Sequence, residues 1–261
     1  MSYQTILTEL VDDATGLITL NRPQAANALS QQMAEELANA IHMAEAQSDI
    51  RCLILTGAGD KAFCAGADLK ERQGMSNMQW HTQHAAFERA LAAILHCKKP
   101  IIAAVNGAAM GGGLELAMAC DFIYAAEGAR FGLTEATLGI MPGMGGTQTL
   151  PRALGTRRAK EYLFLGKILS AEEGYKLGLI NRVCPQTSLL EAAVSTAFSI
   201  AANAPLSVAA IKRAVGEGIE QPLATAMHTE LRYYNELLST QDRAEGINAW
   251  NEKRKPRFVG S

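Results

Sequence analysis

Glu115 is the residue of this chain whose surroundings best suit proton transfer. It lies in the segment 110–120, where its helical neighbours three and four positions away are glycine, methionine and alanine. None of these side chains is charged or a good hydrogen-bonding group, so a helix here would leave the carboxyl group desolvated. Desolvation raises a carboxyl pKa and favours an acid–base role. The position also suits a carboxylate that interacts with the dipole of a helix N-terminus or faces the surface.

Three consecutive glycines, residues 111–113, stand just before Glu115. Each glycine in a helix is less favourable than alanine by ~1 kcal/mol, so the triplet needs a physical reason. Glycine lets a ligand approach bare backbone, and the free N–H groups at a helix start can donate to a developing oxyanion. A flexible turn is the alternative interpretation.

Four other patterns give weaker signals. Gly57-Ala-Gly59 follows an apolar run, but Ala62 stands where a dinucleotide fingerprint needs its third glycine. His81 and His84 are three residues apart, and no glutamate or cysteine completes a metal set, which favours a surface helix pair. Cys64 has no histidine nearby in sequence and is expected to pack in the core. No Gly-x-Ser-x-Gly elbow occurs, so a serine hydrolase has no nucleophile.

The elements that would position Glu115 can be predicted from apolar periodicity. We expect strands at residues 17–20, 52–55, 100–105 and 122–124, and helices that begin at Ser30, cover 80–95 and start again at 111–113. Ser170-Ala-Glu-Glu173 fits a capping box, with Gly178 as a helix stop. Apolar strands that alternate with helices are typical of an α/β fold whose sheet is buried on both faces.

Strand signals end at about residue 189. Segments 189–202, 206–216, 223–238 and 241–252 all have helical patterns. We therefore divide the chain into an α/β body with the active site, residues 1–188, and a helical region, residues 189–261, which would form a lid or an oligomerisation element.

Composition excludes several classes of protein. Hydrophobic residues make up 48% of the chain and charged residues 19%, which argues against disorder. The net charge of −2 gives no reason to expect binding to nucleic acid or to a membrane surface. The least polar stretch, residues 101–120, contains Asn106, Glu115 and four glycines, so a membrane span is not expected.

The start of the chain and its cysteines suggest a compartment. Residues 1–5 have no basic or apolar region of a secretory signal. The five cysteines are an odd number, widely spaced and without a CxxC pair. They are typical of core residues in a reducing compartment, and we expect a cytoplasmic protein.

Three motifs, in chain order, resemble those of the crotonase, or enoyl-CoA hydratase/isomerase, family. They are Ala65-Gly-Ala-Asp-Leu-Lys70, Asn106-Gly-x-x-x-Gly-Gly-Gly-x-Glu115 and Glu135-x-x-x-Gly-Ile-x-Pro-Gly-x-Gly-Gly-Thr-Gln148. The likeness extends from the Asn21-Arg-Pro turn to Glu252-Lys-Arg-Lys255. Within the family, the chain is closest in appearance to the enoyl-CoA hydratases and the methylglutaconyl-CoA hydratases.

The resemblance implies a spiral of ββα units followed by an all-helical trimerisation region, assembled as a homotrimer or a dimer of trimers. It implies an enoyl-CoA hydratase, which adds water across the 2,3 double bond of a 2-enoyl-CoA thioester in fatty-acid or branched amino-acid breakdown. No cofactor is implied, because coenzyme A enters as part of the substrate.

The resemblance also implies the site residues, with no metal among them. Two glutamates would hold the water and move protons, two backbone N–H groups would form an oxyanion hole, and further residues would bind the substrate. The implied residues are Glu115 and Glu135 for catalysis, Ala67 and Gly112 for the oxyanion hole, and Ala67, Asp68, Leu69, Lys70, Gly112, Gly143 and Lys253 for substrate binding.

The chain departs from the family pattern at two positions. Gln24-Ala-Ala26 replaces a segment that commonly carries a lysine, so the resemblance does not carry over one contact with a CoA phosphate. Met144 is larger than usual at its position and would narrow the acyl pocket. The basic residues 253–257 suit either a solvated tail or a phosphate contact.

A role in RNA binding is the alternative of a different class. It lacks an electrostatic basis, because the expected helix 30–47 has no lysine or arginine.

Overall fold

Two β-sheets form the body of the chain, of which the computed structural model describes residues 3–261. The larger sheet has the strand order β1-β2-β3-β5-β7-β10, with β1 (Ile6–Leu10), β2 (Thr15–Leu20), β3 (Cys52–Gly57), β5 (Ile101–Val105), β7 (Phe122–Ala126) and β10 (Arg182–Cys184). Its strands pair in parallel, except that β1 is antiparallel to β2. The smaller sheet has the order β4-β6-β8-β9, with β4 (Ala62–Cys64), β6 (Ala108–Met110), β8 (Arg130–Gly132) and β9 (Ile168–Ser170).

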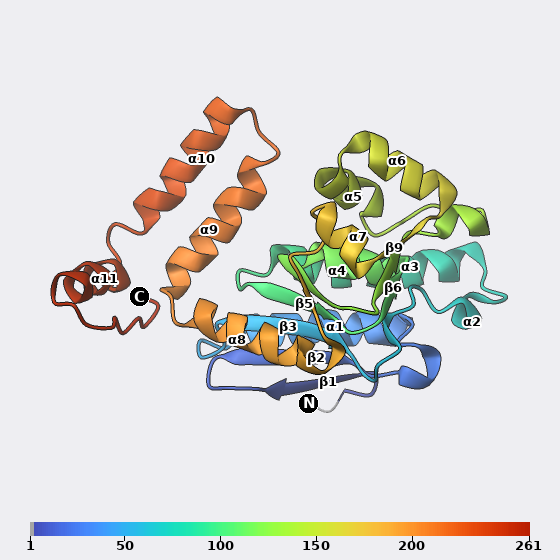
Figure 1. Cartoon of the computed structure of the whole chain (residues 1–261), viewed down its shortest axis with the longest axis horizontal. Coiled ribbons are helices and arrows are strands. Elements are labelled where there is room, and N and C mark those ends of the chain that lie inside the picture. Colours follow the sequence, from blue (N-terminus) through green and yellow to red (C-terminus); the bar gives the residue numbers. More distant parts are fainter. Residues whose placement is uncertain (1–2) are drawn as a thin grey trace.

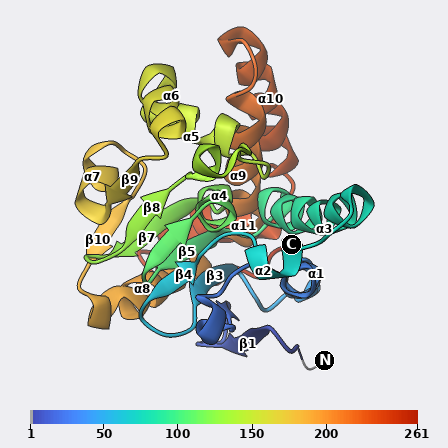
Figure 2. The same cartoon turned by 90° about the vertical axis from the view of Figure 1, so that its right-hand side faces the viewer.

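The chain visits the two sheets in turn. The strands β3, β5 and β7 of the larger sheet are each followed at once by a strand of the smaller sheet, namely β4, β6 and β8. Helices then return the chain: α2 (Leu69–Arg72) and α3 (Asn77–His96) after β4, α4 (Gly112–Ala119) after β6, and α5 (Gly146–Leu154) and α6 (Thr156–Leu165) after β8. This repeat confirms the expected α/β spiral of ββα units (Figures 1 and 2).

The expected elements are present with small shifts at their ends. Helix α1 (Gln31–Ala46) begins after Ser30, whose hydroxyl oxygen accepts a bond of 3.2 Å from the N–H of Met33. The capping box of α7 (Ala171–Lys176) is formed by Ser170 and Glu173. The strands of the smaller sheet were not expected, because runs of three residues are too short to show periodicity.

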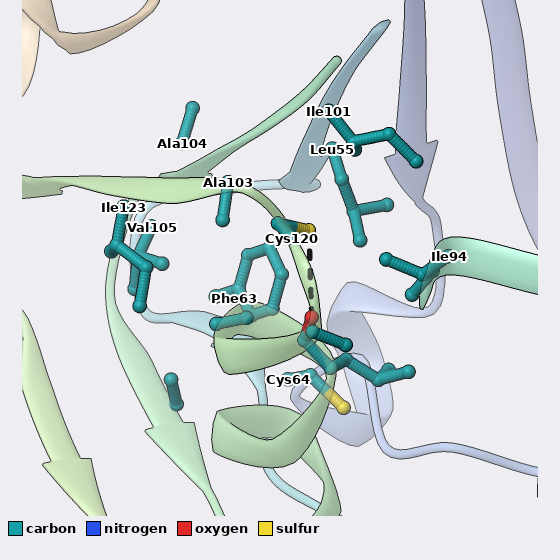
Figure 3. Close-up of a cluster of buried hydrophobic side chains, with 14 of the residues drawn as sticks. Leu55, Phe63, Cys64, Ile94, Ile101, Ala103, Ala104, Val105, Cys120 and Ile123 are labelled. Carbon is teal, nitrogen blue, oxygen red and sulfur yellow. Dashed lines mark hydrogen bonds between the residues drawn. The ribbon is translucent and has the colours of Figure 1, made fainter. Parts of the chain in front are cut away.

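The core lies between the larger sheet and the helices packed on it. Helices α1 and α3 pack together, and the sheet also contacts α4 and α8. Figure 3 shows Phe63 of β4, which is fully buried, among Ala103 and Val105 of β5 and Ile123 of β7. The five cysteines are all buried and free, as expected of core residues.

The four C-terminal helices expected from the sequence are present, but they do not form one unit. They are α8 (Leu189–Ala201), α9 (Pro205–Gly218), α10 (Leu223–Glu236) and α11 (Gln241–Asn251). Helix α8 packs on the larger sheet, where Leu189, Ala193 and Ala197 join the core. Helices α9 and α10 pack on each other and project from the body (Figure 1). Helix α8 thus packs on the body through an alanine-rich face, and a division of the chain at residues 188 and 189 stays a prediction.

No single helix among residues 3–261 has both the length and the apolar composition of a membrane span, although the bent pair Gln186–Ala201 and Pro205–Gly218 meets those criteria together. Met1 and Ser2, part of the start in which no secretory signal was found, lie outside the described residues.

Candidate active site

A cavity of about 420 Å³ is lined by residues of α2, α3 and α4. Six of the residues expected in the site line it: Ala67, Leu69, Gly112, Glu115, Glu135 and Gly143. They come from segments up to 76 positions apart in the chain, between 67 and 143. The fold therefore gathers both glutamates and both expected N–H donors around one space.

Glycine is required beside the expected oxyanion hole, because two backbone segments approach each other closely there. A Cβ atom placed on Gly113 would lie 2.1 Å from the carbonyl oxygen of Cys64, and one on Gly66 would lie 2.8 Å from that of Met110. Gly111 has a φ of +51°, which favours glycine. The triplet is thus the rigid junction of β6 and α4, and the flexible-turn interpretation is wrong.

The N–H groups of Ala67 and Gly112 belong to adjoining segments. A Cβ atom on Gly112 would lie 3.8 Å from the nitrogen of Ala67. Neither N–H group donates a hydrogen bond within residues 3–261. An unpaired N–H group in a partly buried site is unfavourable, so a ligand oxygen that accepted from it would be stabilising. Both N–H groups are available to such an oxygen in the cavity.

The loop that carries Ala67 is fixed by hydrogen bonds on both sides. Leu29 donates its N–H to the carbonyl oxygen of Gly66 at 2.7 Å, and Asp68 donates its N–H to that of Leu29 at 3.0 Å. The carboxylate of Asp68 pairs with Arg22 at 2.8 Å and caps α2. The structure therefore directs Asp68 to Arg22 and not to the cavity, so its effect on a substrate would come through the position of Ala67.

Glu115 is deeply buried in the first turn of α4, with 2% of its surface exposed. Its Oε1 atom accepts two bonds of 2.7 Å, from the N–H groups of Met144 and Gly146. Burial raises the pKa of Glu115 to about 7, and the nearby Glu135 adds to this, although the N–H bonds act in the opposite direction. The predicted desolvation is confirmed, and the surface-facing alternative is wrong.

A stability measurement can test this burial. Glu115→Gln should stabilise the folded protein at pH 8, where the carboxylate is ionised in both states, above its unfolded pKa of 4.5 and its folded pKa of about 7. The gain should be about 3 kcal/mol, because each pKa unit corresponds to roughly 1.4 kcal/mol. Below pH 4.5 the group is protonated in both states, so the gain should vanish there.

Urea denaturation at pH 8 and pH 4 would measure the difference. Glu161→Gln, which changes an exposed glutamate of α6, should have little effect at either pH. Equal stability of Glu115→Gln and the unmodified protein at both pH values would contradict the raised pKa.

Glu135 begins a short 3-10 helix, η2 (Glu135–Leu138), and is 9% exposed. Its Oε2 atom is buried and has no hydrogen-bond partner among residues 3–261. Desolvation raises the pKa of Glu135. A buried oxygen without a partner is costly in a finished core, so it marks a group that faces a ligand or an ordered water. The two carboxyl groups can therefore hold and exchange a proton at the cavity wall.

One cavity wall was missed in the sequence. It consists of side chains on one face of α3, with a partner from α2: Arg72, Trp80, His81, His84 and Phe87. The spacing of these residues along 80–87 could have indicated a shared helix face, since residues three, four and seven apart lie on one side of a helix. His81 is exposed and His84 half-buried, so the two lie on the surface of α3 as expected, and both also line the cavity. Among residues 3–261 no group of three or more histidines, cysteines, aspartates or glutamates is arranged to hold a metal.

Gly143 is held against this wall. A Cβ atom on Gly143 would lie 2.7 Å from Cε1 of His84, so the two segments touch. The adjacent Met144 is buried, and its sulfur lies 3.3 Å from where a Cβ on Gly112 would be. Met144 therefore fills space beside the expected oxyanion hole, in keeping with the predicted narrowing of the pocket.

Two expected substrate-binding lysines do not line the cavity. Lys70 is exposed on α2, beside the cavity-lining Leu69. Lys253 follows α11, at the end of the molecule opposite α2 (Figure 1). Lys253 is thus not among the residues that line the cavity of its own chain.

Comparisons of this chain with known proteins all point to one family. The family model described as enoyl-CoA hydratase/isomerase matches residues 12–261. Crotonyl-CoA hydratase of Syntrophomonas wolfei is 39% identical over 99% of both chains, and mitochondrial enoyl-CoA hydratase of Pongo abelii is 41% identical over 95% of this chain and 84% of its own. The crystal structure of an enoyl-CoA hydratase from Bacillus anthracis has a TM-score of 0.97 and 44% identity, and the match covers 99% of this chain and all of that one.

Proposed function

Because the chain belongs to the enoyl-CoA hydratase/isomerase family, we propose that it is a hydro-lyase that adds water across the 2,3 double bond of a 2-enoyl-CoA thioester. The observation that carries the proposal is the pair of desolvated carboxyl groups, Glu115 and Glu135, at a cavity that two backbone N–H donors also line. Relatives named enoyl-CoA hydratase and crotonyl-CoA hydratase support this reaction.

The thioester carbonyl oxygen would accept hydrogen bonds from the N–H groups of Ala67 and Gly112. Both groups lack a partner within residues 3–261, and they belong to backbone segments that touch. As the double bond is attacked, negative charge moves to this oxygen and forms an enolate. Fixed donors stabilise such charge without reorganisation, and each can contribute about 10²–10³-fold to the rate.

Glu115 would act as the base toward water. Its Oε1 atom is held by the N–H groups of Met144 and Gly146, which leaves Oε2 to take a proton. As that proton leaves, the water oxygen bonds to the β-carbon of the acyl chain, and the electrons of the double bond move toward the thioester oxygen.

Glu135 would then donate a proton to the α-carbon, and the enolate electrons form the new C–H bond. Its buried Oε2 atom lacks a protein partner, and its raised pKa favours the protonated form that this step requires. A proton passed from Glu115 to Glu135 restores both groups, so one water is consumed overall. Such acid–base catalysis contributes about 10²–10⁴-fold.

The two carboxyl groups favour hydration over positional isomerisation. An isomerase needs one base to move a proton between two carbons, whereas hydration needs a group for the water and a group for the α-carbon. Both glutamates reach the same cavity, and burial raises the pKa of each.

Loss of the enoyl-thioester absorbance of crotonyl-CoA and of decenoyl-CoA tests the proposal. The purified chain should consume at least one of them and form the 3-hydroxyacyl thioester. Absence of hydration of every 2-enoyl-CoA tried, by folded protein, would overturn it. A product with a shifted double bond would favour the isomerase. Comparison of these two with the branched 3-methylglutaconyl-CoA would decide between fatty-acid and branched amino-acid breakdown.

We also propose that the chain assembles as a homotrimer or a dimer of trimers through α9, α10 and α11. These helices expose large apolar side chains that a monomer would leave in water, such as Val215 on α9 and Leu231 on α10, with 66% and 53% exposed. Lys253 does not line the cavity of its own chain, so we expect any contact of it with a substrate phosphate to involve a neighbouring subunit.

Light scattering at micromolar concentration should give three or six chains per particle. The double variant Val215→Glu and Leu231→Glu should lower this number, because it puts charges on the contact surface. Leu10→Glu, which changes an equally exposed residue of β1, should leave it unchanged. A stable monomer of the unmodified chain would contradict the proposed assembly.

A further inference from the structure

Arg72 is the one residue with a permanent positive charge among those that line the cavity in the described part of the chain. It is half-buried, and its guanidinium carbon lies 3.9 Å from the ring centre of Trp80 and 5.5 Å from that of Phe87. Its Nε atom donates to Gln83 at 2.7 Å. The two terminal nitrogens of Arg72 have no hydrogen-bond acceptor within residues 3–261.

A chain of buried contacts holds this arginine in place. Gln83 is fully buried, and its amide nitrogen donates to the carboxylate of Glu71 at 2.7 Å. The same carboxylate accepts the N–H of Gln31 at 3.1 Å. Glu71 lies close enough to stabilise the charge of Arg72, but its oxygens are engaged by neutral donors. A buried polar chain of this kind fixes one orientation of the guanidinium group.

The position of Arg72 along the cavity follows from the contacts of α3. The thioester oxygen would lie at Ala67 and Gly112, and the double bond beside Glu115 and Glu135. His84 touches Gly143, whose neighbour Met144 donates to Glu115. The wall of α3 would therefore face the part of the acyl chain beyond the double bond. Arg72 lies on Trp80 and Phe87 of that wall.

We propose that Arg72 forms a carboxylate subsite, and that the preferred substrates are 2-enoyl-CoA thioesters whose acyl chain ends in a carboxylate. This rests on the proposed hydration and names its substrate class. A planar guanidinium group with free terminal nitrogens matches a carboxylate in two parallel hydrogen bonds. The two glutamates in the same cavity would repel an anionic acyl group, and Arg72 offsets that repulsion. His81, exposed at the rim, adds a further donor.

The phosphates of coenzyme A are the other source of an anion, and a matched pair of substrates separates the two. Glutaconyl-CoA is crotonyl-CoA with a carboxylate on its terminal carbon, and 2-hexenedioyl-CoA bears the same relation to 2-pentenoyl-CoA. All four carry the same coenzyme. A phosphate contact of Arg72 would affect all four equally, whereas a carboxylate contact would affect only the two diacids.

The experiment compares kcat/KM of the full-length chain and of Arg72→Met, which keeps apolar contact with Trp80 and removes the charge. At least one diacid should be preferred by the unmodified enzyme over its matched monoacid. Arg72→Met should lower kcat/KM for that diacid by roughly 30- to 100-fold, the effect of losing a charged hydrogen-bond pair, and should change it less than about 3-fold for the monoacid. Arg89→Met, which changes an exposed arginine of α3, should alter neither.

Gln83→Leu gives a second measurement. It removes the acceptor of Arg72 Nε and leaves the charge, so the preference for the diacid should weaken but not vanish. Hydration of the monoacids alone, or equal losses on both members of a pair in Arg72→Met, would overturn the carboxylate subsite and leave the hydratase proposal intact. No hydration of any of the four would count against the hydratase proposal itself.

Discussion

Replacement of either carboxyl group by its amide, as in Glu115→Gln and Glu135→Gln, is expected to lower turnover by at least ~10²-fold. Each amide keeps the size and much of the hydrogen bonding of the glutamate but cannot exchange a proton. Glu115 is held at Oε1 by two N–H groups, and a glutamine carbonyl can accept the same two bonds. The geometry of the site should thus persist while its chemistry is lost.

These two variants should keep their affinity for acyl-CoA although they lose turnover. The dissociation constant of a saturated acyl-CoA, measured by calorimetry, should change little, because neither carboxylate is expected to contact the coenzyme. Glu161→Gln on the exposed side of α6 should keep full turnover. Near-normal turnover by folded Glu115→Gln or Glu135→Gln would contradict two-glutamate catalysis, whereas loss of binding and turnover together would indicate a damaged cavity.

Replacement of Gly112 by proline should also cause a large loss, for a different reason. Gly112 is the first residue of α4, where proline is well tolerated by a helix. Proline has no N–H group, so Gly112→Pro removes one of the two proposed oxyanion donors. We expect a loss of about 10²–10³-fold in kcat, or ~3–4 kcal/mol of transition-state stabilisation.

Gly112→Ala is the matched control for this loss. It adds a Cβ atom 3.3 Å from the sulfur of Met144, as proline does, and keeps the N–H group. Methionine is flexible, so the alanine variant should retain most of its turnover. Equal losses in the two variants would mean that the side chain and not the donor matters, and circular dichroism would establish that both are folded.

Local patterns in the sequence were sufficient for much of the secondary structure. The hydroxyl of Ser30 caps α1, and Ser170 with Glu173 forms the capping box of α7, because such caps depend on residues within one helical turn. The long apolar strands were recognisable for the same reason. The three-residue strands of the smaller sheet were not, since their pairing partners are distant in the chain and no local pattern specifies them.

Glu115 could be selected from its neighbours alone, because an uncharged helical environment implies desolvation. Glu135 could not. Its surroundings in sequence are ordinary, and only the resemblance to a family pointed to it. Glu135 follows β8, and its Oε1 atom lies 3.0 Å from where a Cβ atom on Gly111 would be, so its burial depends on the close approach of Gly111.

The tertiary structure alone decided which polar residues face the cavity. Asp68 and Lys70 stand beside Ala67 in sequence, yet the ion pair with Arg22 turns Asp68 away, and Lys70 lies on the exposed side of α2. Arg72 and His84 were not expected in the site and line it. A sequence determines the chemistry that each residue can perform and the local element that holds it. Which side chains meet depends on contacts between segments far apart in the chain, such as the bonds from Met144 and Gly146 to Glu115, and those contacts form only when the whole spiral packs.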